Sequence, residues 1–259
     1  MRLKNIAVMT GILLALAGTT VTAQSLKGMS LNGSTGLIGI PSGRIGWEHS
    51  ANVGLDLGYH AILADPTAHI PKVSMSLFQV AEISFAYDTN GGDDNEDIII
   101  GGKLQLPTRG TAVALGANFQ MLQQNGTSDN AQQIYLAATY PGTFLGMSAE
   151  TTVVVGKTFG AGAGDGDIDF GMGFDLLLFP DVFQGYVHWI NDFANFSYSR
   201  QAAGANAQQR GAFNTGIRID LAANPNLSRF KFVIDALLTD ALDDNRTFGL
   251  GVAFGVPIR

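Results

Sequence analysis

The stretch from Phe248 to Ile258 alternates bulky apolar residues with residues that have almost no side chain. One row holds phenylalanine, leucine, valine and isoleucine, whereas the other holds glycine, alanine and proline. A period of two is typical of a β-strand with two unlike faces. The same pattern recurs upstream, over 53–61, 113–121, 167–176 and 213–221. The chain therefore needs surroundings that accept bulky apolar groups on one face of a sheet and leave little room on the other.

This alternation predicts twelve strands and no amphipathic helix after the N-terminal region. The expected strands are 52–62, 72–78, 81–88, 97–106, 111–122, 132–140, 144–158, 167–178, 183–191, 211–221, 229–238 and 246–258. Short and long connections alternate between them. The short links lie at 79–80, 107–110, 141–143, 179–182 and 222–228, and the long polar links lie at 63–71, 89–96, 123–131, 159–166, 192–210 and 239–245. One end of the sheet therefore has short turns, and the other carries long loops.

An even number of strands of about ten residues, with short turns at one end and long loops at the other, is typical of a transmembrane β-barrel. Every backbone amide must be paired within the protein in lipid, so such a sheet has to close on itself. The alternative is a soluble β-sandwich, but only 14% of residues are charged, against about 25% in soluble domains. We therefore predict an all-β, antiparallel transmembrane β-barrel of about twelve strands, with short periplasmic turns and longer extracellular loops.

Three regions are expected. Residues 1–23 are typical of a signal peptide, because Arg2 and Lys4 precede an apolar run that ends in small residues. Residues 24–51 are expected to lie in the periplasm or to fold inward and plug the lumen, and residues 52–259 form the barrel. The chain has no cysteine, so it has no disulfide framework. These features predict a protein of the bacterial outer membrane.

The inward row of the predicted strands carries many charges. The charged candidates for the lumen are Asp56, Glu82, Lys103, Glu150, Asp169, Asp175, Arg218, Asp220, Lys231 and Asp235. Unpaired charges in a dry interior would cost several kcal/mol each, so the lumen must be hydrated or these groups must be paired. We expect Arg218 and Lys231 to be the centres of the salt bridges. An acid-rich lumen would favour cations over anions.

No arrangement of residues predicts catalysis, a metal site or a cofactor. The four histidines are scattered, and none has the spacing of a catalytic triad. Asp165, Asp167 and Asp169 have the spacing of the first calcium ligands of an EF-hand, but Phe170 and Leu176 stand where that loop needs Gly and Glu. A lipid-modifying or proteolytic barrel is the enzymatic alternative. Removal of Arg2 and Lys4 leaves 13 basic and 22 acidic residues, a net charge of −9, which argues against nucleic acid as a partner.

Three segments resemble a known family. They are "GSTGLIGIPSGRIGWEHSANVGLDLGYHA" from Gly33, "IPKVSMSLFQVAEISFAYD" from Ile70 and "DIIIGGKLQLP" from Asp97. Their order resembles the YjbH-like outer-membrane β-barrels that are linked to bacterial exopolysaccharide operons, mainly over residues 30–110. The resemblance implies a role near polysaccharide export, and it implies no catalytic residues.

Two functions are consistent with these observations. One is a narrow passive channel, or an accessory of exopolysaccharide export. The alternative is a plugged structural or surface-interaction barrel without transport activity, whose loops at 192–210 and 239–245 meet partners. The expected partners are outer-membrane lipid, the barrel assembly machinery, and polysaccharide or small solutes.

Overall fold

The computed structural model describes residues 28–48, 51–92, 95–124, 126–160, 168–196, 198, 211–244 and 246–258, and the expected signal peptide lies outside them. Twelve strands form the fold. They are β1 (Val53–Ile62), β2 (Ala68–Leu77), β3 (Ala81–Gly92), β4 (Asn95–Leu106), β5 (Ala112–Gln124), β6 (Thr127–Phe144), β7 (Met147–Gly160), β8 (Asp169–Leu177), β9 (Val187–Ala194), β10 (Ala212–Asp220), β11 (Lys231–Thr239) and β12 (Thr247–Ile258). A single-turn helix, α2 (Pro180–Phe183), precedes β9, and a 3-10 turn, η1 (Leu221–Ala223), follows β10.

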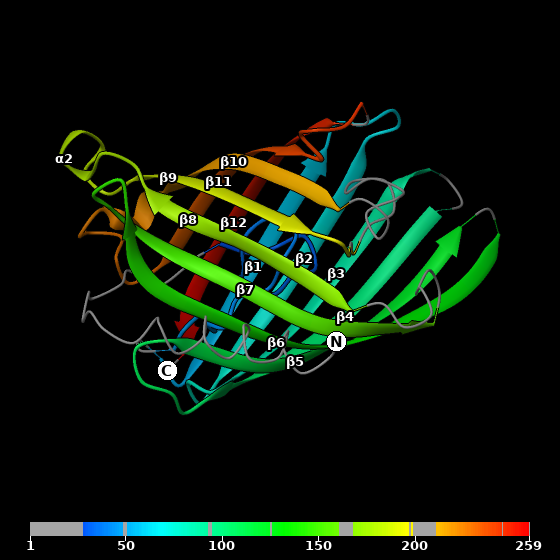
Figure 1. Cartoon of the computed structure of the whole chain (residues 1–259), viewed down its shortest axis with the longest axis horizontal. Helices are drawn as coiled ribbons and strands as arrows, with labels where there is room; N and C mark the ends of the chain where they lie inside the picture. The colour runs from blue at the N-terminus through cyan, green and yellow to red at the C-terminus, as the bar shows by residue number, and fades with distance from the viewer. Residues whose placement is uncertain are drawn as a thin grey trace, which may run out of the picture.

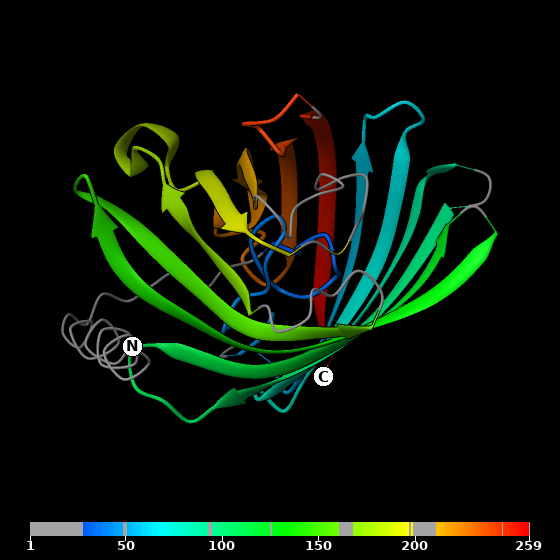
Figure 2. The ribbon, with the colours of Figure 1, turned by 45° about the vertical axis from the view of Figure 1, so that its right-hand side comes forward.

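The sheet is closed, and every strand pairs with its neighbours in the sequence in an antiparallel manner. The first and last strands complete the ring, with a register that runs from Val53 opposite Ile258 to Ile62 opposite Gly249. Figures 1 and 2 show the strands inclined around a common axis. Closure leaves no strand edge without a partner, which is the condition for a sheet in lipid. The predicted twelve-stranded antiparallel barrel is confirmed.

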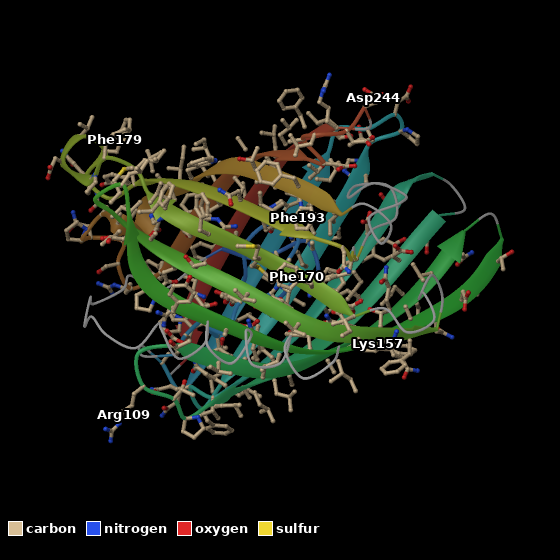
Figure 3. All side chains as sticks on the ribbon, in the orientation of Figure 1. Arg109, Lys157, Phe170, Phe179, Phe193 and Asp244 are labelled. Carbon is tan, nitrogen blue, oxygen red and sulfur yellow. The ribbon has the colours of Figure 1, made fainter. Side chains whose placement is uncertain are left out.

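The outer face of the barrel is apolar. Leu57, Ile100 and Leu250 are about half exposed although they are large hydrophobic residues. Figure 3 shows the outer surface of β8 and β9, with Phe170 and Phe193 labelled, between Arg109 at one end and Asp244 at the other. A contiguous apolar face of this extent is stable only when something other than water covers it. The bulky row therefore faces lipid.

Several strands are longer than the sequence pattern predicted. Most of the predicted loops at 89–96 and 123–131 belong to strands, because β3, β4, β5 and β6 extend nearly to their hairpin turns. β6 has 18 residues and includes the predicted link at 141–143. β2 begins at Ala68, inside the predicted loop at 63–71. These segments lack an apolar row, so periodicity alone did not identify them as strands.

Two connections differ in kind from the prediction. The β6–β7 turn lies at Leu145 and Gly146, which both have positive φ, as a two-residue hairpin loop of the mirror-image type requires. Phe183 was expected in a strand but closes α2, which projects from the end of the barrel that carries the short turns (Figure 1). Among the described residues, no helix is long and apolar enough to cross a bilayer.

Candidate functional site

Residues 28–48, which we call the lumen segment, lie inside the ring of strands (Figure 2). All of these residues except Gly39 are buried. The segment folds back on itself, with bridges between Met29 and Thr35 and between Gly36 and Pro41. It then leads to β1 through residues 49–52. The barrel interior is thus occupied by the chain that immediately precedes its first strand.

All ten charged side chains predicted to face the lumen are buried in the barrel. Their exposed fractions are 7% or less, for Asp56, Glu82, Lys103, Glu150, Asp169, Asp175, Arg218, Asp220, Lys231 and Asp235. Nine of them lie within hydrogen-bonding or ion-pair distance of other lumen groups, as described below. Asp220 has a different role, because its side chain accepts a hydrogen bond from the amide of Ala222 and caps η1.

Arg218 and Asp235 form the central ion pair. Nε and Nη2 of Arg218 donate to the two carboxylate oxygens of Asp235 at 2.8 and 3.0 Å. His60 Nε2 lies 3.3 Å from the same carboxylate. Both Arg218 and Asp235 are 2% exposed, and paired geometry of this kind is what allows two charges to remain buried. This cluster joins β1, β10 and β11.

A second cluster lies where the lumen segment meets β1 and β11. Nζ of Lys231 donates to Asp56 at 2.9 Å and lies 4.8 Å from the centre of the Trp47 ring. The indole of Trp47 donates to the other oxygen of Asp56 at 2.9 Å. Gly54 and Gly255 leave the space for this ring, since a Cβ at Gly54 would lie 2.2 Å from it. Trp47 therefore sits in a glycine-lined socket.

Three further ion pairs lie at the lumen segment. Lys103 lies 3.3 Å from Glu82, between two wall strands. Arg44 of the segment lies 2.7 Å from Glu150 of the wall and 2.6 Å from Glu48 of the segment itself. Burial lowers the pKa of the Arg44 guanidinium, but the two adjacent carboxylates outweigh this effect, so that its pKa is raised. Arg44 therefore remains charged.

The remaining predicted acids lie on β8. Asp175 bonds Nδ1 of His188 at 2.6 Å. Asp169 accepts from Gln133 at 2.7 Å and from the hydroxyl of Thr158 at 2.5 Å. Among the described residues, no group of three or more His, Asp or Glu side chains could hold a metal ion.

Sequence reasoning missed three wall residues that contact the lumen segment. Lys72 donates to the carbonyl of Ser30 at 2.6 Å, and Thr139 accepts from the amide of Gly43 at 2.9 Å. Asp192 accepts from the amides of residues 38 and 39, although it was placed in the loop at 192–210. The alternation of His188, Ile190 and Asp192 on β9 would have identified Asp192 as an inward residue.

Part of the lumen is a hydrophobic core. Leu37, Ile38 and Ile40 of the lumen segment are no more than 1% exposed and belong to one cluster with wall residues. The wall contributes Ile62, Ile70, Ile99, Tyr135, Ala137, Val154, Ile190 and Leu237 to this cluster. The interior therefore combines buried ion pairs with an apolar core.

The connection between β9 and β10 also enters the barrel. Tyr198 is 5% exposed and donates to Gln133 at 2.8 Å, and Gln120 donates to its carbonyl at 2.6 Å. Phe196 packs edge-on against Tyr198 and joins the apolar cluster. The rest of this predicted loop, at 197 and 199–210, lies outside the described residues. Two separate parts of the chain thus occupy the lumen.

A closed twelve-stranded sheet with an apolar outer face and an inward row of ionisable side chains defines an outer-membrane β-barrel. Solved structures share this fold. The chain is similar to the KdgM porin, at 7% identity and a TM-score of 0.51, over 79% of this chain and 99% of that one. It is also similar to the NanC porin, at 10% identity and a TM-score of 0.50, over 80% of this chain and 100% of that one.

No protein-family model and no curated protein sequence matches the chain. The specific resemblance to YjbH-like barrels therefore has no support from these comparisons, whereas the outer-membrane barrel that it implied is present. Both solved structures are porins, and at 7% and 10% identity the likeness extends to the fold.

Proposed function

We propose that this protein is a channel for small cations that is held closed by its lumen segment. The observation that carries the proposal is the polar attachment of that segment to the wall, through Glu82, Glu150 and Asp192. Water can replace contacts of this kind when the segment moves. The partners that this role requires are outer-membrane lipid and the barrel assembly machinery.

The charge of the wall supports the choice of solute. Among the described residues, the strands carry ten buried carboxylates and only four buried lysines and arginines, an excess of six acids. The four cations are Lys72, Lys103, Arg218 and Lys231. A ring of acidic side chains lowers the energy of a cation in a narrow pore and raises that of an anion.

Replacement of Ile40 by lysine tests the channel. Ile40 is fully buried in the apolar cluster, so a charge at this position should expel the lumen segment without altering the wall. We expect few conductance steps from the wild type in planar bilayers and frequent steps from Ile40→Lys. Trypsin cleavage after Arg44, which is 8% exposed, should report expulsion of the segment.

Gel mobility before and after boiling serves as the control for a folded barrel. A folded Ile40→Lys barrel whose Arg44 is cleaved but which carries no current would contradict the channel. Ile40→Leu keeps the volume and the apolar character, and it should behave like the wild type.

A permanently plugged barrel is the second candidate, and the apolar cluster favours it. Burial of a large aliphatic side chain contributes about 1.5–3 kcal/mol, and Leu37, Ile38 and Ile40 would all lose this on leaving the barrel. This candidate predicts that the segment stays protected from trypsin under all conditions in which the barrel remains folded.

A role as an accessory of exopolysaccharide export rests on the YjbH-like resemblance of the segments from Gly33, Ile70 and Asp97. It predicts that the purified barrel binds polysaccharide from its own source in a pull-down. The boiled protein, in which the barrel is lost, is the control and should not bind.

A further inference from the structure

The wall of the barrel holds the lumen segment mainly by its backbone. Glu82 accepts from the amides of Thr35 and Gly46 at 2.7 and 2.8 Å. Asp192 accepts from two consecutive amides, at residues 38 and 39, at 2.8 and 2.7 Å. A carboxylate that receives two amide hydrogens is a strong, charge-assisted acceptor. The contacts of Asp192 with residues 38 and 39 place no requirement on the side chains of those residues, whereas Glu82 also accepts from the hydroxyl of Thr35 at 2.6 Å.

Basic wall residues bind the carbonyl groups of the same segment. Lys72 donates to the carbonyl of Ser30 at 2.6 Å. Lys103 donates to those of Thr35 and Ser42 at 2.8 and 3.2 Å, and Arg218 donates to that of Gly36 at 3.1 Å. The wall thus presents acids to amides and bases to carbonyls, which is a pattern that recognises a peptide chain as such.

Glycines in the segment allow the close approach that these bonds need. A Cβ at Gly43 would lie 2.2 Å from the carbonyl oxygen of Ala112, which is backbone and cannot move aside. A Cβ at Gly46 would lie 2.6 Å from both Asp56 and Lys231, and one at Gly39 would lie 2.9 Å from Asn214. The wall therefore excludes a side chain at position 43, and at positions 39 and 46 it favours glycine because a Cβ would displace a polar side-chain end.

We propose that the lumen is a peptide-binding site whose ligand class is a glycine-rich loop, recognised through its backbone and through glycines at positions 39, 43 and 46. The lumen segment is the ligand that the chain supplies to itself. When that segment is displaced, the same site binds a peptide of this class from a separate molecule. The use of this site to close a channel rests on the proposed function, but the binding does not require conduction.

A labelled synthetic peptide of residues 28–48 tests the site. The receptor is the full-length chain carrying Ile40→Lys, whose own segment is expelled while its wall is intact. We expect a saturable rise in fluorescence anisotropy with this barrel and little rise with the wild type, because the wild-type site is occupied. A second receptor, Arg44→Ala, loosens the segment by a different route and replaces the first if Ile40→Lys does not fold.

Two altered peptides test how the site recognises its ligand. The Gly43→Ala peptide should bind about tenfold more weakly or worse, since its added methyl group meets backbone. The Met29→Leu peptide is the matched control and should bind within about twofold of the original peptide, since this swap conserves volume.

Three results would overturn the inference. They are the absence of binding to a folded barrel whose own segment trypsin or, for Arg44→Ala, chymotrypsin can reach, equal binding of the Gly43→Ala peptide, and equal binding to the wild type. Conductance is recorded on the same samples. A silent barrel that binds the peptide would overturn the channel alone, and a conducting barrel that ignores the peptide would overturn the peptide site alone.

Discussion

Gly251 shows why the inward-facing row of β12 consists of residues with little or no side chain. A Cβ at this position would lie 2.3 Å from Nε2 of His60, whose ring is held against Asp235. We expect Gly251→Ala to lower the free energy of unfolding by about 1–3 kcal/mol, as overpacking does. Urea titration of the protein in lipid vesicles measures this change.

Gly142→Ala is the matched control for this substitution. Gly142 lies in β6, and no atom lies within 4 Å of its hypothetical Cβ. This variant should be neutral or slightly more stable than the wild type, by up to about 1 kcal/mol. Equal destabilisation by both substitutions would mean that the loss comes from the backbone and not from His60.

Val252 tests the opposite face of the same strand. Its side chain is 46% exposed on the outer surface and lies at the middle of β12. Val252→Arg should lower the free energy of unfolding by about 2–4 kcal/mol if this position lies near the bilayer midplane. Val252→Leu should be nearly neutral. A harmless arginine would show that the outer face at this position is not covered by lipid.

Individual charged residues were largely predictable because strand parity assigns a side to each of them. Glu82, Lys103 and Arg218 follow from the alternation of their strands. The inward position of Asp192 was not predicted, because the predicted strand ended at residue 191. The partner of each charge was also beyond the sequence, because Glu150 pairs with Arg44 of a segment that has no periodicity.

At the scale of elements, the lumen segment is fastened by the ion pair of Arg44 with Glu150. Arg44→Ala leaves a buried carboxylate without its cation. We expect this to lower the free energy of unfolding by about 3–5 kcal/mol, as the removal of one partner of a buried ion pair typically does. We expect chymotrypsin, which cleaves after residues such as Leu31, Leu37 and Trp47, to reach the lumen segment more readily, together with a shift of Trp47 emission to longer wavelength. A Trp189→Phe background isolates that signal.

The double variant Arg44→Met with Glu150→Leu is the comparison. It removes both charges and should restore much of the protection that Arg44→Ala loses, because apolar groups of similar volume replace the buried pair. If the double variant is as accessible as the single one, the pair acts through specific hydrogen bonds and not through the cost of an unpaired charge.

The elements that sequence analysis missed share a physical cause. The early residues of β6, "TSDNAQQ", are polar except for Ala131, because a strand that extends beyond lipid has no apolar row to conserve. The alternation therefore marks the part of a strand that lies in lipid, and a hydrogen-bonded strand can continue past it. α2 is too short to have a periodicity of its own.

At the scale of the whole molecule, the excess of acids on the wall determines ion preference. In a gradient of potassium chloride, the open Ile40→Lys barrel should give a reversal potential whose sign shows that potassium crosses more readily than chloride. Glu82 is a suitable site for a charge-removing control, since it is 1% exposed. Glu82→Gln should reduce the selectivity, and a chloride-selective barrel would contradict the assignment of the wall.

The architecture of the barrel was predictable, whereas the content of its lumen was not. Twelve alternating segments joined by alternately short and long links leave few arrangements other than a closed ring. In contrast, residues 28–48 form two tight turns that are stabilised by residues far away in the chain. Contacts of this kind leave no local pattern.

The arrangement of the lumen segment imposes an order on folding. The bond between Arg218 and Gly36 joins residues 182 positions apart, and that between Asp192 and Ile38 joins residues 154 positions apart. Contacts so distant along a chain form slowly, because a long loop must be closed before they add any stability. Residues 28–48 precede every strand, yet they reach their final contacts only after β9 and β10 arrive. A segment that is synthesised before every strand is thus among the last parts of the chain to reach its native contacts, and the sheet has to close around its own leading end.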